Sequence, residues 1–360
     1  MTDSVGGGGE DDLPWLAASG PWADLVVSTR VRLARNLVGV GFRGRNSEAD
    51  REGVLEQVQA AAADAPSLAG ATLHRLDPLP LEGRQWLQER QLVSRELAGL
   101  DPGGRATGGG AVLVAGAVAV MLNEEDHLRM QGLRSGFALD EALADAERAD
   151  GELGARLSFA FHPEFGYLTA CPTNVGTGLR ASVLIHLPGL VLTREIAKVL
   201  QGLAQVGLTY RGLYGEGSAV LGNLFQLSNQ TTLGKSESEL LDHLGRLVRQ
   251  VMECEIQARD VLRRDAAAVL DDQVWRAWGV LSHARAVTFD ELVELLSGVR
   301  LGVSLGILPP LPLGTMNRLL VLAQSAHLAR AAGTSLEDEA LAVHRATLVR
   351  RLLADEGRAR

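Results

Sequence analysis

The stretch of the chain richest in potential chemistry is residues 170–180, which read ACPTNVGTGLR. It places a cysteine, a turn rich in Gly and Asn, and an arginine within ten positions. The chain has only two cysteines, Cys171 and Cys254, which is too few for a disulfide framework or a metal cluster. The hydroxyl of Thr173 and backbone N–H groups of the turn can stabilise a thiolate at Cys171, with an inert buried cysteine as the alternative. Cys254 lies in a long helical pattern, where the inert alternative is favoured.

A pair of acidic residues, Glu124 and Glu125, follows an apolar run at 111–122 that predicts a buried strand. A carboxylate at a strand end beside a cleft can orient a substrate N–H group and remove its proton. The alternative is the acidic start of a helix predicted beyond Glu125, where negative charge favours the helix dipole. Glu216 lies between two glycines, and a flexible loop there can close over a substrate with a second carboxylate.

Arginines from four segments form the third candidate group. Arg30 and Arg32 are two positions apart, so on an extended segment both side chains point to the same side. Arg129, Arg180 and Arg211 each lie in a separate segment. Guanidinium groups bind phosphate oxygens bidentately, so the five side chains could converge on a polyphosphate. For any one arginine alone, a surface salt bridge is the commoner role. The chain has no GxxxxGK[ST] phosphate loop and no dinucleotide-binding fingerprint.

Bulk properties narrow the class of protein. The 360 residues are enough for two domains with their own cores, and the net charge of −9 argues against a nucleic-acid binder. The sequence has no apolar run of about 18 residues and no basic-then-apolar leader, so we expect no membrane contact and a cytoplasmic location.

The order of predicted elements indicates an α+β fold. Residues 1–24 are acidic and Gly-rich and predict a flexible arm. We predict strands at 25–33, 111–122, 157–161 and 183–187, helices at 47–64, 80–98 and 136–150, and a turn at 101–110.

The remainder of the chain has helical patterns only. A capping box, Ser236-x-x-Glu239, begins a long amphipathic helix, and similar boxes at Thr288 and Thr334 predict two more. No strand signal remains after about residue 259. We therefore predict a catalytic domain at 25–258 and an all-helical C-terminal domain at 259–360.

Five segments, taken in order, resemble the ATP:guanido phosphotransferase family. Residues 28–36 (STRVRLARN) are similar to its SSRVRLARN signature, 123–129 match NEEDHLR, and 171–180 match CPTNxGTGLR. Residues 211–216 (RGLYGE) resemble its specificity loop, and 227–237 match SNQxTLGxSE. The resemblance covers residues 25–258 and implies a glutamine-synthetase-like domain, with an antiparallel sheet flanked by helices.

The resemblance also implies roles for individual residues. Glu125 would be the catalytic base that holds a substrate guanidinium, Glu216 the second carboxylate, and Cys171 a thiolate near the reacting nitrogen. Mg²⁺ would bridge the phosphates of ATP with few direct protein ligands. The implied ATP-binding residues are Ser28, Thr29, Arg30, Val31, Arg32, Gln91, Arg129, Arg180, Ala181, Ser182, Val183, Leu184, Arg211, Gly212, Leu213, Tyr214 and Gly215.

Within the family, the chain resembles the bacterial branch that phosphorylates arginine side chains of proteins. Only 27 residues precede Ser28, and the extra length follows the kinase region. This branch implies protein substrates with exposed arginines, delivery of marked proteins to a Clp-type protease, an activator protein, and a homodimer formed through the C-terminal domain. Two alternatives remain: a kinase for small guanidines, disfavoured by the short N-terminal segment, and a non-catalytic adaptor, disfavoured by the intact Glu125, Cys171 and Glu216.

Two positions depart from the family pattern. Gln91 stands where the family usually has a histidine that contacts the nucleotide, so we expect altered nucleotide affinity rather than loss of activity. Residues 341–346 (LAVHRA) keep only the last two positions of the RDxxRA phosphoarginine motif. We therefore expect a weak or absent response to phosphoarginine.

Overall fold

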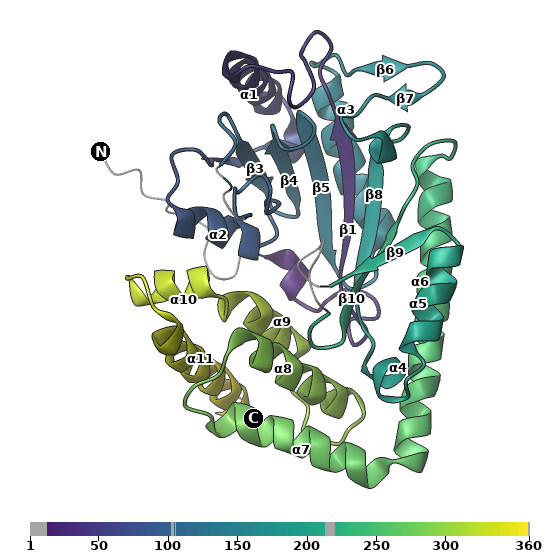
Figure 1. Ribbon diagram of the computed structural model, residues 1–360, viewed down its shortest axis with the longest axis vertical. Helices are drawn as coiled ribbons and strands as arrows, with labels where there is room; N and C mark the ends of the chain where they lie inside the picture. Colours follow the sequence, from purple (N-terminus) through teal and green to yellow (C-terminus); the bar gives the residue numbers. More distant parts are fainter. Residues whose placement is uncertain (1–12, 102–103, 105, 213–219, 359–360) are drawn as a thin grey trace.

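The computed structural model describes residues 13–101, 104, 106–212 and 220–358. Eight strands of this part form one antiparallel sheet (Figure 1). In spatial order the strands are β2 (Thr72–Arg75), β3 (Ala111–Ala115), β4 (Val118–Leu122), β5 (Leu128–Ser135), β1 (Val26–Arg35), β8 (Leu179–His186), β10 (Leu224–Asn229) and β9 (Leu208–Arg211). The helices of this part are α1 (Glu48–Ala63), α2 (Leu81–Glu89), α3 (Leu139–Gly154), α4 (Pro188–Leu192), α5 (Ile196–Gln205) and α6 (Glu237–Asp265). A small hairpin, β6 (Phe161–His162) and β7 (Gly166–Tyr167), lies outside the sheet.

One face of the sheet is apolar and forms the main core. On β1, Val31 and Leu33 point to this face and pack in a cluster that also contains residues of α1, α3 and α6. Gly132 on β5 explains the close approach of α3, because a Cβ there would lie 2.2 Å from the carbonyl oxygen of Ala142. Since side chains alternate along a strand, the residues between these apolar ones point to the opposite face.

A second group of helices covers one end of the sheet (Figure 1). These are α7 (Ala267–His283), α8 (Phe289–Ser304), α9 (Leu313–Leu322), α10 (Ser325–Ala332) and α11 (Asp338–Arg358). The apolar side chains of α7, α8, α9 and α11 form a second core with the short helix η1 (Pro14–Leu16) and with Val27, Leu133 and Leu184 of the sheet. The helices therefore pack on the sheet through a continuous apolar contact.

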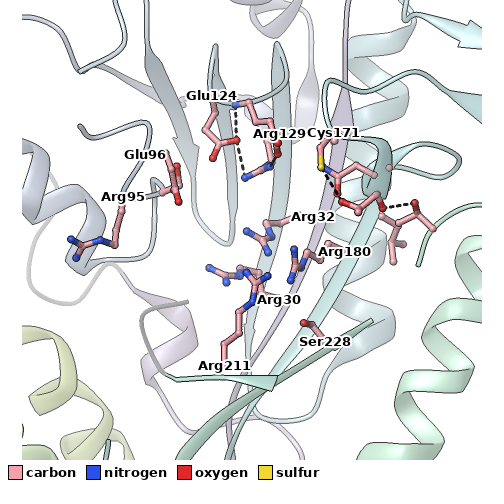
Figure 2. A pocket seen from close by; sticks show the side chains of 18 of the residues that line it. Arg30, Arg32, Arg95, Glu96, Glu124, Arg129, Cys171, Arg180, Arg211 and Ser228 are labelled. Carbon is pink, nitrogen blue, oxygen red and sulfur yellow. Dashed lines mark hydrogen bonds and ion pairs between the residues drawn. The ribbon is translucent and has the colours of Figure 1, made fainter. Parts of the chain in front are cut away.

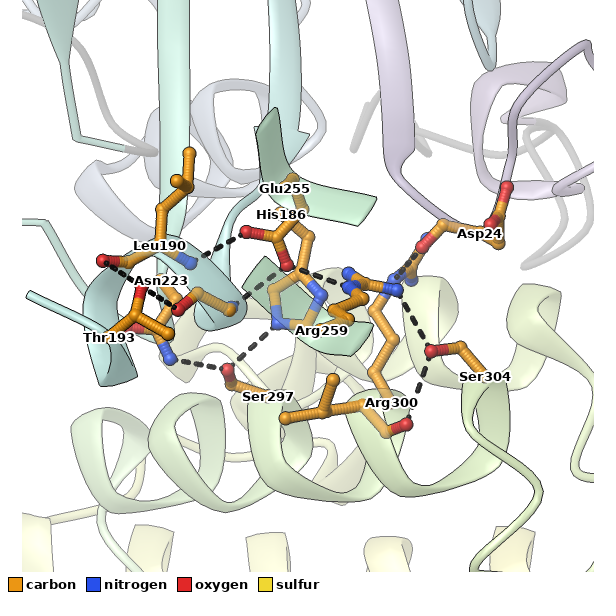
Figure 3. Close-up of polar contacts among 12 residues, drawn as sticks. Asp24, His186, Leu190, Thr193, Asn223, Glu255, Arg259, Ser297, Arg300 and Ser304 are labelled. Atoms are coloured by element: carbon orange, nitrogen blue, oxygen red, sulfur yellow. Dashed lines mark hydrogen bonds and ion pairs between the residues drawn. The ribbon is translucent and has the colours of Figure 1, made fainter. Parts of the chain in front are cut away.

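Buried polar groups also join these helices to the sheet (Figure 3). Glu255 on α6 accepts hydrogen bonds from the backbone N–H groups of Gly189 and Leu190 and from Nε of Arg259. Nη1 of Arg259 in turn donates to the hydroxyl of Ser304 on α8 at 2.9 Å. His186 at the end of β8 lies 2.8 Å from the hydroxyl of Ser297 on α8. Burial lowers the pKa of His186 well below its usual value, so the imidazole is neutral in this contact.

Several predicted boundaries need correction. The residues after Glu125 form strand β5 rather than a helix, and the run at 111–122 is split into a hairpin at Gly116, whose φ is +56°. The helix predicted at 80–98 ends at Glu89, because Gln91 adopts a left-handed φ of +61°. Of the strand predicted at 157–161, only residue 161 belongs to a strand.

Two of the three predicted helix starts are confirmed, and the third is wrong. Ser236 forms the capping box with Glu239, and Thr288 accepts a hydrogen bond from the backbone of Glu291. At Thr334 the prediction is wrong, because α11 begins four residues later at Asp338. Helix α6 continues through residue 258, where we placed a domain boundary, so that division stays a prediction. Across the described part of the chain, no helix is both long and apolar enough to cross a membrane.

Candidate active site

A cavity of about 600 Å³ lies on the polar face of the sheet. The structure brings the five arginines from the separate sequence segments together in its lining, namely Arg30, Arg32, Arg129, Arg180 and Arg211. Figure 2 shows Arg30, Arg32, Arg180 and Arg211 grouped beneath the Glu124–Arg129 pair, with Cys171 on one side.

Strand register explains this convergence. Arg32 on β1 is paired with Arg180 on β8, and Arg30 is paired with Ser182. Directly opposite residues on antiparallel strands share a face of the sheet. At the sheet edge, Arg211 on β9 is paired with Gln226 on β10 and reaches the same cavity.

The arginine cluster is electrostatically strained. Burial and repulsion by Arg180, Arg129 and Arg211 lower the pKa of Arg30 to about 10. Burial and the neighbouring arginines lower the pKa of Arg32 well below its usual value, opposed by Glu124. Among the described residues, Nε of Arg30 and Nε of Arg32 are buried without a hydrogen-bond partner. A polyanion would satisfy these donors and relieve the repulsion.

Glu124 and Glu125 have opposite pKa shifts. Glu124 is buried, which disfavours its charge, but the ion pair with Arg129 at 2.8 Å and hydrogen bonds from the Glu125 N–H and the Ser94 hydroxyl lower its pKa. Burial raises the pKa of Glu125, and the charges of Glu124 and Asp126 add to the rise. Glu125 is therefore the carboxylate better suited to accept a proton.

The rest of the 123–129 segment holds this pair in place. Asn123 has a φ of +57° and donates hydrogen bonds to the carbonyl groups of Arg51 and Gly109. Asp126 accepts hydrogen bonds from Asn36 and from the backbone of Ala170, both at 2.7 Å. Because a strand rather than a helix follows, an acidic helix start does not explain the pair.

Cys171 lines the cavity beside Glu125. Its sulfur is 3.0 Å from the hydroxyl of Thr173, and the thiol forms a hydrogen bond with the Glu125 carboxylate that opposes the rise in its pKa. Gly178 allows the loop to lie against β1, because a Cβ there would be 2.6 Å from the carbonyl oxygen of Ala34. Cys254, by contrast, is exposed on α6.

Two family models match this chain, one over most of the sheet and one over the C-terminal helices. The family model described as ATP:guanido phosphotransferase, C-terminal catalytic domain, matches residues 53–258, which is more than half of the chain. The chain belongs to the ATP:guanido phosphotransferase family. The model described as Protein-arginine kinase McsB C-terminal domain matches residues 267–359. The family resemblance of the sequence motifs is thus confirmed, and the chain is an enzyme of this class.

Curated relatives agree with this family assignment. A Protein-arginine kinase of Symbiobacterium thermophilum is 45% identical over 347 residues, covering 94% of this chain and 96% of the relative. A Protein-arginine kinase of Bacillus subtilis is 41% identical over 343 residues, covering 94% of this chain and 93% of the relative.

Solved structures confirm the α+β fold of this guanido phosphotransferase. The substrate-free duplicated taurocyamine kinase from Schistosoma mansoni is 27% identical with a TM-score of 0.57. That match covers 70% of this chain but only 37% of the duplicated kinase. A lombricine kinase, 22% identical with a TM-score of 0.54 over 65% of this chain and 66% of its own, shows the shared fold alone.

Several residues that were predicted to bind ATP point their side chains away from the cavity. Val31, Ala181 and Val183 point to the apolar face and are fully buried in the main core. Thr29 donates a hydrogen bond to the carbonyl of Gly136, away from the cavity. Strand alternation is the reason, because a run of consecutive residues cannot face one side.

Three more predicted residues, Ser28, Leu184 and Gly212, are buried and do not line the cavity. Ser182 is covered by Gln226, which donates a hydrogen bond to its hydroxyl at 2.9 Å. Leu213, Tyr214, Gly215 and Glu216 lie outside the described residues, so the second carboxylate stays a prediction.

The structure adds cavity residues that sequence reasoning missed. Gln226 and Ser228 on β10 line the cavity, and their alternation with Phe225 and Leu227 was a usable signal. A wall formed by the segment 88–96 was not predicted apart from Gln91, whose side-chain oxygen is 3.5 Å from Nη1 of Arg30.

Proposed function

We propose that this guanido phosphotransferase transfers the γ-phosphoryl group of ATP to arginine side chains of proteins. The observation that carries the proposal is the juxtaposition of a buried arginine cluster with Glu125, a carboxylate whose pKa is raised. The names of the curated relatives supply the substrate class, since each is called a Protein-arginine kinase.

The proposed reaction divides the cavity into two parts. The arginines bind the phosphate oxygens and neutralise the charge of the transferring group, so positioning and electrostatics supply most of the rate. At the other part, Glu125 holds the substrate guanidinium and accepts a proton from the attacking nitrogen. A P–N bond forms as the bond between the γ-phosphorus and the bridging oxygen breaks, and ADP leaves with that electron pair. Glu216 is proposed as the second carboxylate on the guanidinium, and Cys171 as the thiolate beside the reacting nitrogen.

Magnesium is proposed to arrive with the nucleotide. The described residues contain no group of three or more His, Cys, Asp or Glu side chains that could hold a metal ion. In this proposal the ion would be held mainly by phosphate oxygens, where it would neutralise charge on the phosphates.

The wider biology of the chain is proposed from the family resemblance. It comprises a cytoplasmic location, recognition of marked proteins by a Clp-type protease, an activator protein, and a homodimer formed through the helices after residue 258. The ranges matched by the two family models support the division into a catalytic part and a C-terminal part.

The test is a phosphoryl-transfer assay with Mg-ATP. One arm contains an unstructured protein rich in arginine, and parallel arms contain free arginine or taurocyamine. The products are read by mass spectrometry under non-acidic conditions, because acid hydrolyses the P–N bond. We expect phosphoarginine on the protein, and its loss in the Glu125→Ala variant. Phosphorylation of a free guanidine alone would identify a small-guanidine kinase instead, and no transfer in any arm would contradict the proposal.

A further inference from the structure

The last turn of α2 connects the cavity wall to the C-terminal helices. Glu89 is only 7% exposed, and its carboxylate accepts hydrogen bonds from the backbone N–H groups of Ala326 and His327 at 2.9 and 3.1 Å. The ring Nδ1 of His327 lies 2.7 Å from the same carboxylate. Both oxygens of the buried Glu89 carboxylate therefore find hydrogen-bond partners at the N-terminal end of α10.

The contact serves α10 as well as Glu89. The first N–H groups of a helix have no partner within the helix, and a side chain at the N-cap usually supplies one. In the described structure the N-cap residue of α10, Gln324, makes no such hydrogen bond. Glu89 therefore replaces the local cap, and its negative charge suits the positive end of the helix dipole.

Packing around this contact is continuous. The guanidinium groups of Arg90 and Arg330 both lie over the indole ring of Trp86 on α2, with their Cζ atoms 4.5 and 4.6 Å from the ring centroid. Ala326 packs in the apolar cluster that also contains Leu87 and Leu92. The end of α2 is therefore held against α10 by apolar, aromatic and charged contacts together.

From Glu89 the chain reaches the arginine cluster within two residues. The backbone N–H of Gln91 bonds to the carbonyl of Gln88, and that of Leu92 to the carbonyl of Leu87. These bonds hold Gln91 at its left-handed φ of +61°, a conformation that is unfavourable for residues other than glycine. The backbone carbonyl of Gln91 accepts a hydrogen bond from the side-chain amide of Gln131. The side-chain oxygen of Gln91 lies 3.5 Å from Nη1 of Arg30.

We propose that Glu89 is a positioning residue, which fixes Gln91 against the arginine cluster and lets the C-terminal helices set the affinity for ATP. It acts through Gln91 and touches neither substrate. The proposal rests on the proposed function, because ATP is the expected occupant of the cavity.

The test compares ATP binding by the full chain and by Glu89→Gln, which preserves size but removes the charge. We expect the dissociation constant and the KM for ATP to rise by about tenfold, with a smaller change in kcat. Glu89→Asp keeps the charge and should recover part of the affinity. A control is Asn317→Ala, which removes a buried acceptor of Arg300 between α8 and α9, away from the contact of α2 with α10. The control should lower the melting temperature and leave ATP affinity unchanged.

A double-mutant cycle with Gln91→Ala separates positioning from general stabilisation. If Glu89 acts through Gln91, the Glu89→Gln change should have little further effect once Gln91 is removed. Additive effects, or unchanged affinity in a folded Glu89→Gln protein, would overturn the inference. Should that variant fail to fold, His327→Ala removes one of the three contacts and should weaken ATP binding by a smaller factor. An unaltered chain that does not bind ATP would instead overturn the proposed function, and this inference with it.

Discussion

Two sets of buried arginines in this molecule have similar burial but different partners. Burial lowers the pKa of Arg30, in the cavity, and of Arg300, on α8, to about 10. Arg300 donates hydrogen bonds to Asn317 at 2.7 Å and to the carbonyl groups of Ala23 and Asp24. Arg30 is instead surrounded by other arginines, and within the described structure its Nε lacks a partner.

The difference shows what separates a binding site from a scaffold. A buried guanidinium stabilises the fold when its donors meet carbonyl or carboxylate oxygens, as those of Arg300 do. In Arg35 the two Nη atoms find such oxygens, on Ala34, Thr177 and Asp150, although its Nε has no partner in the described structure. A cluster of like charges with unused donors destabilises the fold unless an anion binds. The hydrogen-bond partners of each guanidinium, rather than its burial or its pKa alone, distinguish the two sets of arginines.

The largest expected effect comes from the carboxylate beside the cluster. Glu125→Gln should lower kcat by about 10²–10⁴-fold, because general bases contribute on this scale. ATP binding should remain, since the arginines are untouched. Steady-state kinetics and equilibrium binding check both parts, and a variant with ordinary turnover would remove Glu125 from the mechanism.

A scaffold arginine should affect stability instead. Arg300→Met should lower the free energy of unfolding by about 3 kcal/mol, because the amide of Asn317 and two carbonyl groups lose their donor in a buried place. ATP affinity should be unchanged. Denaturant titration and ligand binding measure the two quantities, and unchanged stability would argue that Arg300 belongs with the cavity set.

The raised pKa of Glu125 predicts a pH profile. A base must be ionised, so kcat/KM should rise with pH, with an acidic limb above the ordinary glutamate pKa of about 4.3. For stability the sign is opposite. A folded-state pKa above the unfolded value gives stability below the unfolded pKa, which is lost as pH rises through the folded pKa. At neutral pH Glu125→Gln should therefore be no less stable than the unaltered chain, and a large loss of stability would contradict the assigned shift.

The smallest effect is expected from free phosphoarginine. Of the motif at 341–346, Arg345 is buried and donates hydrogen bonds to the carbonyl groups of Ala323 and Val287, so it serves the scaffold. Adding phosphoarginine should leave the rate of phosphoryl transfer nearly unchanged. A clear activation would show that the remaining arginine still supports a phosphoarginine site.

The sequence predicted the convergence of the arginines better than it predicted the local elements around them. Spacing by two positions was enough to place Arg30 and Arg32 on one face, because strand alternation is a local property. The same rule excludes Val31 and Val183, which the family resemblance alone had included. Strand β5 was missed because acidic residues before an apolar run also begin helices.

Long-range contacts account for what could not be predicted. Gln91 is in the cavity because α2 ends in a left-handed residue and because Glu89 packs on α10, more than 200 positions away in the chain. No local pattern encodes that pairing. By contrast, the polar residues Gln226 and Ser228 alternate with apolar ones on β10 and could have been predicted from the sequence.

The most direct test of the central comparison is thermal unfolding of Arg32→Met and Arg300→Met, each with and without Mg-ATP. Ligand at about 100 times its dissociation constant stabilises a protein by about 2.7 kcal/mol, which is readily seen as a rise in Tm. We predict that Arg32→Met keeps or raises the Tm without nucleotide and loses the rise with it, whereas Arg300→Met lowers the Tm and keeps the rise. The account would be contradicted if Arg32→Met were strongly destabilised and still responded fully to ATP.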